Sequence, residues 1–183
     1  MNPRSDYVRS VIADEISDSI INGRARFEER NGLIPGFRFY SNWNEEFNLQ
    51  DCATGVKAFS IIQMLINNGY IKNNTLLILD EPEAHLHPQW IVEYARLIVW
   101  MYKEMGVNFL ISTHSTDLVI ALKYISEAKK CSEVLEFFLA KRGHSDGKYI
   151  FESSGLNIDQ IFKSFNKSFD KLESYAIHNS STM

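Results

Sequence analysis

Residues 77–86 read LILDEPEAHL, an apolar run that ends abruptly in two adjacent carboxylates. The run starts near Thr75 and is typical of a buried β-strand, which Pro82 ends because it has no backbone donor. A rigid strand tip would let Asp80 support a magnesium ion through a water. The next carboxylate, Glu81, could polarise a water that attacks a terminal phosphate. The pair by itself is equally compatible with a polar strand end that opens a turn.

A second apolar run, residues 107–112, is followed closely by His114. Residues 88–105 between the two runs carry apolar side chains at helical spacing, and Gly106 supplies a stop signal. Strand, helix and strand of these lengths predict a right-handed crossover unit with parallel strands. The two carboxylates and His114 would then follow the carboxyl ends of neighbouring strands, where open α/β sheets bind ligands.

A turn of small residues comes before both strands and leads into a predicted helix with an apolar face. A helix start of this kind leaves free N–H groups and the positive end of the helix dipole, which suit a phosphate. The candidate residues are Thr54, Gly55, Val56 and Lys57. Taken alone, Thr54 and Gly55 are better explained as a plain N-cap and a flexible glycine. Their position ahead of the carboxylate strand and the histidine strand favours the phosphate site.

Three segments together resemble a known family: ATGVKAF (53–59), LLILDEPEAHLHP (76–88) and STHS (112–115). They are similar to the carboxyl-terminal half of an ABC-like ATPase lobe, of the bacterial AAA-type or overcoming-lysogenization-defect-like group. Relatives occur among chromosome-maintenance and recombination ATPases. The resemblance runs from about Phe47 to Asp117. It implies an α/β fold, a P-loop NTPase-like (ABC ATPase-like) parallel sheet with flanking helices, present as a partial lobe that uses ATP and Mg²⁺.

The resemblance also implies a role for each candidate residue. The loop at residues 53–57 would be the signature loop, which closes on a phosphate held by a second protomer. Asp80 would be the metal-supporting Walker B carboxylate and Glu81 the catalytic base. His114 would be the switch histidine that faces the terminal phosphate. Residues 83–87 would lie where such families keep a loop that crosses the dimer interface.

One element of the family pattern is absent from these 183 residues: Gly, four residues, Gly, Lys, then Ser or Thr, the Walker A loop that wraps the phosphates. We therefore expect a partial ATPase core from a split subunit or a shortened gene. Its partners would be ATP, an amino-terminal lobe or a second protomer in a homodimer, and an effector such as a nuclease in bacterial defence or DNA maintenance. The missing strand would leave a gap between residues 107–112 and 133–141, which self-association or the chain's own residues 38–40 would fill.

Two other interpretations stay open. His85 and His87, together with the nearby carboxylates including Glu83, mimic a metal cluster, as in a metal-dependent nuclease-like centre. A His-x-His pair shares one side only on an extended segment, so this interpretation needs an extended loop. The other alternative is a non-catalytic interaction module that keeps the fold without nucleotide.

Three regions are expected along the chain: an amino-terminal helix and signature-subdomain arm (1–50), the ATPase core (51–175) and a loose tail (176–183). Isoleucines and valines at helical spacing predict a long amphipathic helix over Tyr7–Glu29. Aromatic residues in 32–49 are expected in the core rather than stacked on bases. The remaining expected elements are strands at 133–141 and 148–152 and a helix at 158–175.

Composition narrows the class of protein. The chain is 45% hydrophobic and 23% charged, which fits one globular domain. A formal charge of -4 offers no electrostatic reason for direct nucleic-acid contact. Cys52 and Cys131 lack metal-ligand spacing, which suggests reduced thiols in a cytoplasmic protein. No apolar leader or membrane span is predicted.

Overall fold

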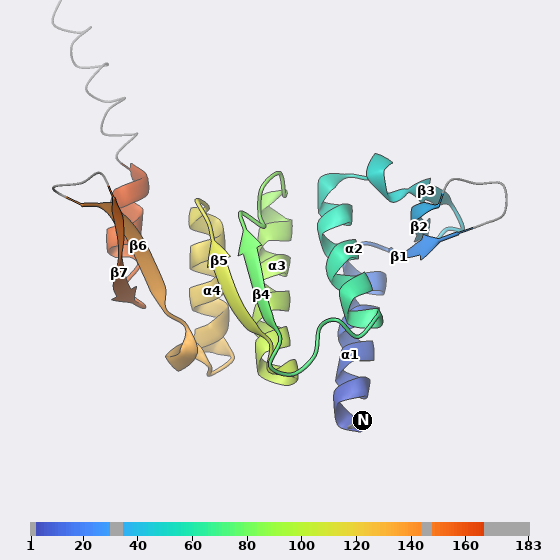
Figure 1. The fold of residues 1–183 in the computed structure, drawn as a ribbon, viewed down its shortest axis with the longest axis horizontal. Helices are drawn as coiled ribbons and strands as arrows, with labels where there is room; N and C mark the ends of the chain where they lie inside the picture. Colours follow the sequence, from blue (N-terminus) through green and yellow to red (C-terminus); the bar gives the residue numbers. More distant parts are fainter. Residues whose placement is uncertain (1–2, 30–34, 144–147, 167–183) are drawn as a thin grey trace, which may run out of the picture. The chain divides into compact units, whose positions relative to one another are not determined.

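The computed structural model describes residues 3–29, 35–143 and 148–166, with side chains from residue 6 onward. These residues form two compact units, one up to Thr113 and one from His114 (Figure 1). No helix in the described ranges combines the length and the apolar character that a membrane crossing requires.

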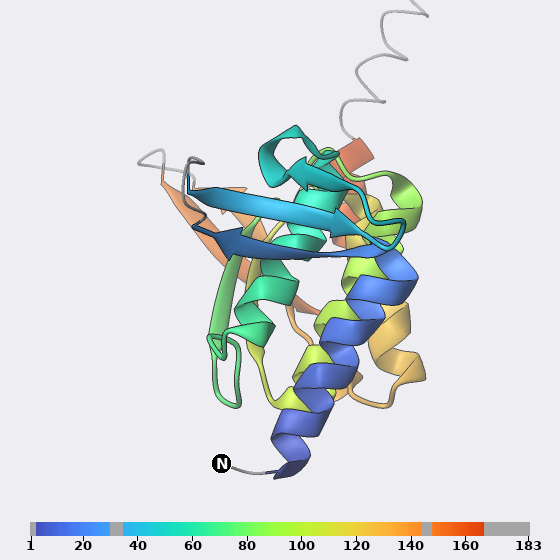
Figure 2. The same cartoon turned by 90° about the vertical axis from the view of Figure 1, so that its right-hand side faces the viewer.

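The first unit holds most of the elements. Helix α1 leads through a π-helical turn, η1, into the antiparallel sheet β1–β2–β3, and α2 then precedes the parallel pair β4–β5 with α3 between them (Figure 2). The bounds are α1 Pro3–Glu15, η1 Ile16–Ile20, β1 Gly23–Glu28, β2 Gly36–Ser41, β3 Glu46–Asn48, η2 Leu49–Asp51, α2 Thr54–Asn67, β4 Leu76–Asp80, α3 Pro88–Trp100, η3 Met101–Met105 and β5 Asn108–Ser112.

The second unit is a helix followed by a β-hairpin and a further helical segment. Its elements are α4 Thr116–Ala128, η4 Ser132–Val134, β6 Phe137–Arg142, β7 Tyr149–Gly155 and a helix over 159–166. Val119, Ile158 and Ile161 form its buried cluster. Both predicted strands are found, with the first starting later than expected because residues 132–134 form a 3₁₀ turn. The predicted helix is confirmed over 159–166, whereas its remainder and the 176–183 tail lie outside the described residues.

The strand, helix and strand unit is confirmed. β4 and β5 pair in parallel, from Leu76 opposite Asn108 to Asp80 opposite Ser112. Helix α3 starts with Pro88 at its first position, where the missing N–H costs nothing. The helical run ends at Gly106, whose φ of 67° lies in the left-handed region that glycine adopts freely.

The predicted helix over Tyr7–Glu29 is wrong in its last third. The helical run ends at Ile20, Asn22 turns the chain with a φ of 50°, and β1 begins at Gly23. From there burial alternates every two residues, with Gly23 and Ala25 buried and the arginines between and after them exposed. The isoleucine spacing ended at Ile21, so the helical period did not extend into this strand.

The aromatic residues of the small sheet divide between core and surface. Phe39 is buried, as expected. Phe37, Trp43 and Phe47 are exposed by 50%, 72% and 44%, so the core prediction is wrong for them.

Residues 38–40 do not fill the predicted gap. They belong to β2, which pairs with β1 on one side and β3 on the other. The expectation that this segment joins the parallel sheet is therefore wrong, because its backbone groups are already used in an antiparallel ladder.

One face of the parallel pair is open. In the described residues β4 and β5 form a two-stranded sheet, and Leu76, Ile78 and Leu110 on one face are 57%, 70% and 58% exposed. Leu77 and Leu79, on the other face, are half-buried. The prediction of a fully buried strand is thus wrong for one face, because a two-stranded sheet needs a covering layer on each side to bury both.

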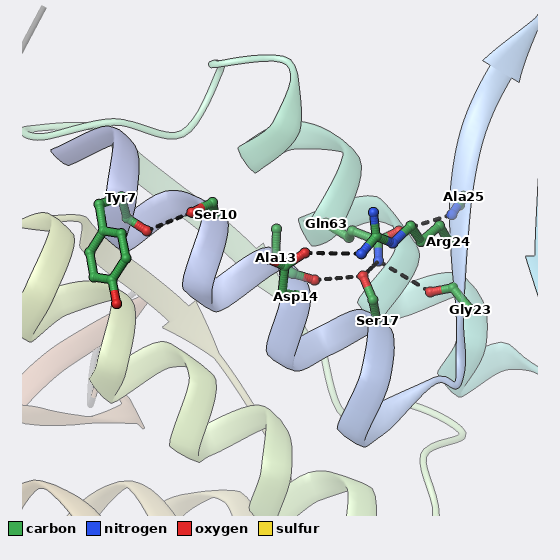
Figure 3. Close-up of polar contacts among 9 residues, drawn as sticks. All are labelled: Tyr7, Ser10, Ala13, Asp14, Ser17, Gly23, Arg24, Ala25 and Gln63. Atoms are coloured by element: carbon green, nitrogen blue, oxygen red, sulfur yellow. Dashed lines mark hydrogen bonds and ion pairs between the residues drawn. The ribbon is translucent and has the colours of Figure 1, made fainter. Parts of the chain in front are cut away.

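A buried polar cluster joins α2 to α1 and β1 (Figure 3). Gln63 is fully buried; its Nε2 donates to Ser17 Oγ at 2.7 Å and to the Gly23 carbonyl at 3.3 Å. The Ala25 N–H donates to Gln63 Oε1 at 2.9 Å, and Ser17 Oγ donates to the Ala13 carbonyl at 2.7 Å. One side chain therefore satisfies backbone and hydroxyl groups on both neighbouring elements.

Replacing Gln63 should cost stability. Gln63→Leu keeps a side chain of similar volume but leaves the Ala25 N–H and the Gly23 carbonyl without their partner. We expect this loss to lower the free energy of unfolding by about 1–3 kcal/mol. Urea unfolding followed by circular dichroism measures the change. Gln89→Leu, at an exposed position of α3, is the control and should shift stability far less. Equal effects of the two variants would contradict the role assigned to the cluster.

The open apolar face should make the chain self-associate. Because exposed apolar area favours association, we expect the double variant Ile78→Ser and Leu110→Ser to reduce the associated fraction measured by light scattering. Val92→Ser is the control, since Val92 is 47% exposed on α3 instead. A wild-type chain that stays monomeric at high concentration would refute this expectation.

Candidate functional site

The two predicted site carboxylates lie at the tip of β4, tied to the tip of β5. Ser112 Oγ donates a hydrogen bond to Asp80 Oδ1. The Glu81 N–H donates to the Ser112 carbonyl at 2.9 Å, which extends the parallel ladder one residue beyond the strand. Both side chains are exposed. The backbone at the tip is therefore rigid while both carboxylates remain accessible to a ligand.

The backbone at Glu81 is unusual. Its φ is 44°, in the left-handed region that a side chain with a Cβ rarely adopts. Two turns follow, closed by hydrogen bonds from the Ala84 N–H to the Glu81 carbonyl and from the Leu86 N–H to the Glu83 carbonyl, both 2.9 Å. Strained residues of this kind cluster at functional sites. The left-handed backbone of Glu81 is thus a reason, independent of the sequence pattern, to consider this residue part of a functional site.

The turn does not provide the metal cluster that the two histidines could have formed. His85 also has a left-handed φ, 65°, so the segment is not the extended loop that His-x-His chelation needs. His87 instead caps the start of α3, with its Nδ1 accepting from the Gln89 N–H at 3.4 Å. Across the part of the chain that the structure describes, no three His, Cys, Asp or Glu side chains are grouped to hold a metal ion.

The candidate phosphate loop starts α2 as predicted. Its N-cap residue, Ala53, offers no side-chain cap to the N–H groups of the first turn, which begins at Thr54. The ammonium group of Lys57 is engaged by the preceding segment, because its Nζ donates to the Gln50 carbonyl at 2.8 Å. Val56 is half-buried.

Gly55 has a packing reason to be glycine. It is buried, and a Cβ there would lie 2.0 and 2.1 Å from Cε3 and Cζ3 of Trp90. The indole of Trp90 stacks edge-on against Phe59, and Phe59 stacks edge-on against Tyr94, each with ring centroids 5.5 Å apart. This aromatic row, Trp90, Phe59 and Tyr94, joins the start of α2 to α3.

The turn after β4 holds a buried carboxylate whose burial was not predicted from the sequence. Glu83 is 7% exposed; its Oε1 accepts from Thr113 Oγ1, and Oε2 is buried without a hydrogen-bond partner in the described structure. Burial and, secondarily, the negative charge of Glu83 raise the pKa of Tyr94 to about 12. A glutamate in a polar turn carries no sequence signal of burial, because glutamate is almost always exposed.

His114 is the first residue of the second unit and is exposed. It directly follows Thr113 at the end of β5, and Ser115 then caps α4 by accepting from the Leu118 N–H at 3.2 Å. The structure thus brings Asp80 and Glu81 together with Ser112, and it sets Thr54 and Gly55 at a helix start. The relation of His114 to these residues remains a prediction.

Comparison with known proteins shows which families the chain resembles. Residues 49–121 match the family model described as "AAA domain, putative AbiEii toxin, Type IV TA system". These residues therefore resemble an ABC-like AAA-type ATPase segment. The matched segment spans the α2 start, the β4 tip and the histidine that follows β5.

Two curated relatives illustrate the likeness. The energy-coupling factor transporter ATP-binding protein EcfA2 of Clostridium perfringens is 48% identical over 44 residues, 24% of this chain and 15% of that protein. The Old nuclease of Escherichia phage P2 is 29% identical over 98 residues, 54% of this chain and 17% of the phage protein. The chain thus matches only about a sixth of the length of either relative.

Solved structures show the fold. A structure from work on ATP-driven dimerization and DNA-stimulated activation of SMC ATPases has a TM-score of 0.56 at 16% identity, covering 88% of this chain and 94% of that one. The Smc head domain of Pyrococcus furiosus, bound to the C-terminal domain of ScpA, has a TM-score of 0.54 at 17% identity, covering 94% of this chain and 38% of that one. The predicted fold class, a P-loop NTPase-like α/β lobe, is confirmed.

The contact between Gly55 and Trp90 should be testable by substitution. Gly55→Ala adds a methyl group that would overlap two carbons of the indole ring. We therefore expect the free energy of unfolding to fall by about 1–3 kcal/mol from overpacking. Trp90→Leu in the same chain should recover part of that loss by vacating the space. Chemical denaturation of the two single variants and the double variant measures the coupling. Purely additive effects would show that the two residues do not meet.

Proposed function

We propose that this chain binds ATP with Mg²⁺ and acts in ATP hydrolysis as the Walker B and signature half of an ABC-like AAA-type ATPase. The single observation that carries the proposal is the strand tip, where adjacent exposed carboxylates follow a parallel strand and the second has a left-handed backbone. The family match over residues 49–121 covers this tip. The transporter relative is likewise an ATP-binding protein.

Each residue has a definite part in this proposal. Asp80 would hold the Mg²⁺ ion, which would neutralise phosphate charge, and its hydrogen bond from Ser112 holds one carboxylate oxygen in place. Glu81 is the general base that polarises the attacking water. His114 contacts the terminal phosphate. The start of α2, Thr54 to Lys57, faces a phosphate held by a second protomer, because its uncapped N–H groups are available to an anion.

The proposed partner supplies the phosphate-wrapping loop, since these 183 residues lack that pattern. An amino-terminal lobe or a second protomer would provide it, and ATP would then gate dimerisation. ATP-driven dimerization is described for the SMC ATPases whose fold this chain resembles. The toxin-related family description and the phage nuclease relative support a bacterial defence or DNA-maintenance setting, with a nuclease as effector.

A non-catalytic interaction module is the alternative. Two observations favour it: the open apolar face of β4 and β5, and the packing reason for Gly55 that does not require a phosphate. Binding of ATP with Mg²⁺ by the assembled protein distinguishes the two functions, because the module would bind neither.

Hydrolysis should depend on a complementing lobe. The isolated chain lacks the N–H donors and the lysine of a Walker A loop, so it should hydrolyse ATP at the background rate. Addition of an amino-terminal lobe should restore turnover. In that assembly Glu81→Gln should lower the rate about 100-fold or more, as loss of a general base does, while ATP remains bound. Phosphate release and retention of labelled ATP measure the two effects.

The matched control is Glu104→Gln, an exposed glutamate in η3, which should leave turnover unchanged. His114→Ala should lower turnover through loss of one phosphate contact. Vigorous hydrolysis by the isolated chain that Glu81→Gln abolishes would overturn the need for a complementing lobe. Full activity of the assembled Glu81→Gln variant would overturn the assignment of the base.

A further inference from the structure

Glu83 is a destabilising residue in the first unit. The residue is buried, with 7% of its surface exposed, and one of its two carboxylate oxygens has no hydrogen-bond partner in the described residues. An unsatisfied buried oxygen lowers stability, and an apolar or amide side chain of similar size would avoid that cost. A glutamate at this position is therefore better explained by a positional requirement than by stability.

The other oxygen of Glu83 joins the turn after β4 to the last residue before His114. Oε1 accepts from Thr113 Oγ1. Nearer the strands, the same two segments are joined by the Glu81 N–H bond to the Ser112 carbonyl, at 2.9 Å, and by the hydrogen bond between Ser112 and Asp80. The hydrogen bond from Thr113 to Glu83 therefore extends this series of connections one residue beyond β5.

The negative charge of Glu83 acts on Tyr94 of α3, whose pKa it helps to raise. Tyr94 is buried and packs edge-on against Phe59 of α2. Phe59 packs in turn against Trp90, whose ring covers Gly55. The aromatic row thus fixes Tyr94 between the two helices, within the electrostatic reach of Glu83.

We propose that Glu83 is a positioning residue: its carboxylate clamps Thr113, and so fixes the end of β5, from which the chain continues into His114, against the turn that carries Glu81. The inference rests on the proposed ATPase function for its consequence in catalysis. The clamp itself is a property of the folded chain and does not depend on nucleotide.

Hydrogen exchange in the full chain tests the clamp directly. The probe is the Glu81 amide, which donates to Ser112 next to the clamp, observed by NMR. We expect Glu83→Ala and Thr113→Val each to speed its exchange about tenfold or more. Glu83→Gln keeps an acceptor for the Thr113 hydroxyl and should change it less than about threefold. Thr75→Val is the control, since it loses a hydroxyl acceptor for the Lys72 N–H before the opposite end of β4.

The same variants in the ATP-hydrolysing assembly separate positioning from general stability. A clamp predicts that Glu83→Ala and Thr113→Val each lower kcat about tenfold with KM nearly unchanged, that the double variant is no worse than either, and that Glu83→Gln restores most of the rate. A merely structural role predicts accelerated exchange throughout the first unit and no rescue by glutamine.

Unchanged exchange at Glu81 in Thr113→Val, or equal behaviour of Glu83→Ala and Glu83→Gln, would overturn the proposal. An assembly that hydrolyses no ATP, but in which exchange responds as expected, would refute the proposed function and leave the clamp supported. Thr113→Val is nearly isosteric, so it tests the clamp even if Glu83→Ala fails to fold.

Discussion

The parallel ladder between β4 and β5 is the constraint on which the candidate site depends. Five residue pairs align the two strands, and the ladder continues past the strand ends through the Glu81 N–H bond to Ser112. Parallel strands end at the same edge of a sheet, so polar residues that follow them along the sequence are brought close in space. The intervening α3 can return the chain to start β5 because it has both a clear start at Pro88 and a stop at Gly106.

The helices around this ladder contribute specificity as much as stability. The aromatic row of Trp90, Phe59 and Tyr94 determines which residue can occupy the start of α2, since only glycine fits beneath the indole. At the other half of α2, Gln63 joins three elements by hydrogen bonds in a fully buried position. Buried polar groups of this kind are stable only when every partner is present, so they specify one arrangement of α1, α2 and β1.

Glu83 differs from Gln63 in that its buried polar atoms are only partly satisfied. The Gln63 cluster has its amide groups bonded, whereas Glu83 retains one buried oxygen without a partner in the described residues. A fold selected only for stability would avoid such a group. Together with the left-handed backbone at Glu81, it marks the turn after β4 as the place where local stability is sacrificed. That pattern is expected where a site must hold charged groups in a defined position.

The amino-acid sequence by itself determined the strand, helix and strand unit, the start of α2 and the adjacent carboxylates of the strand tip. Apolar periodicity, Pro88 and Gly106 are local signals, and they are read within one turn or one strand. Only the tertiary structure decided the end of the first helical run at Ile20, the exposure of Ile78 and the burial of Glu83. These depend on which surfaces meet, and Thr113, whose hydroxyl donates to Glu83, lies 30 residues further along the chain.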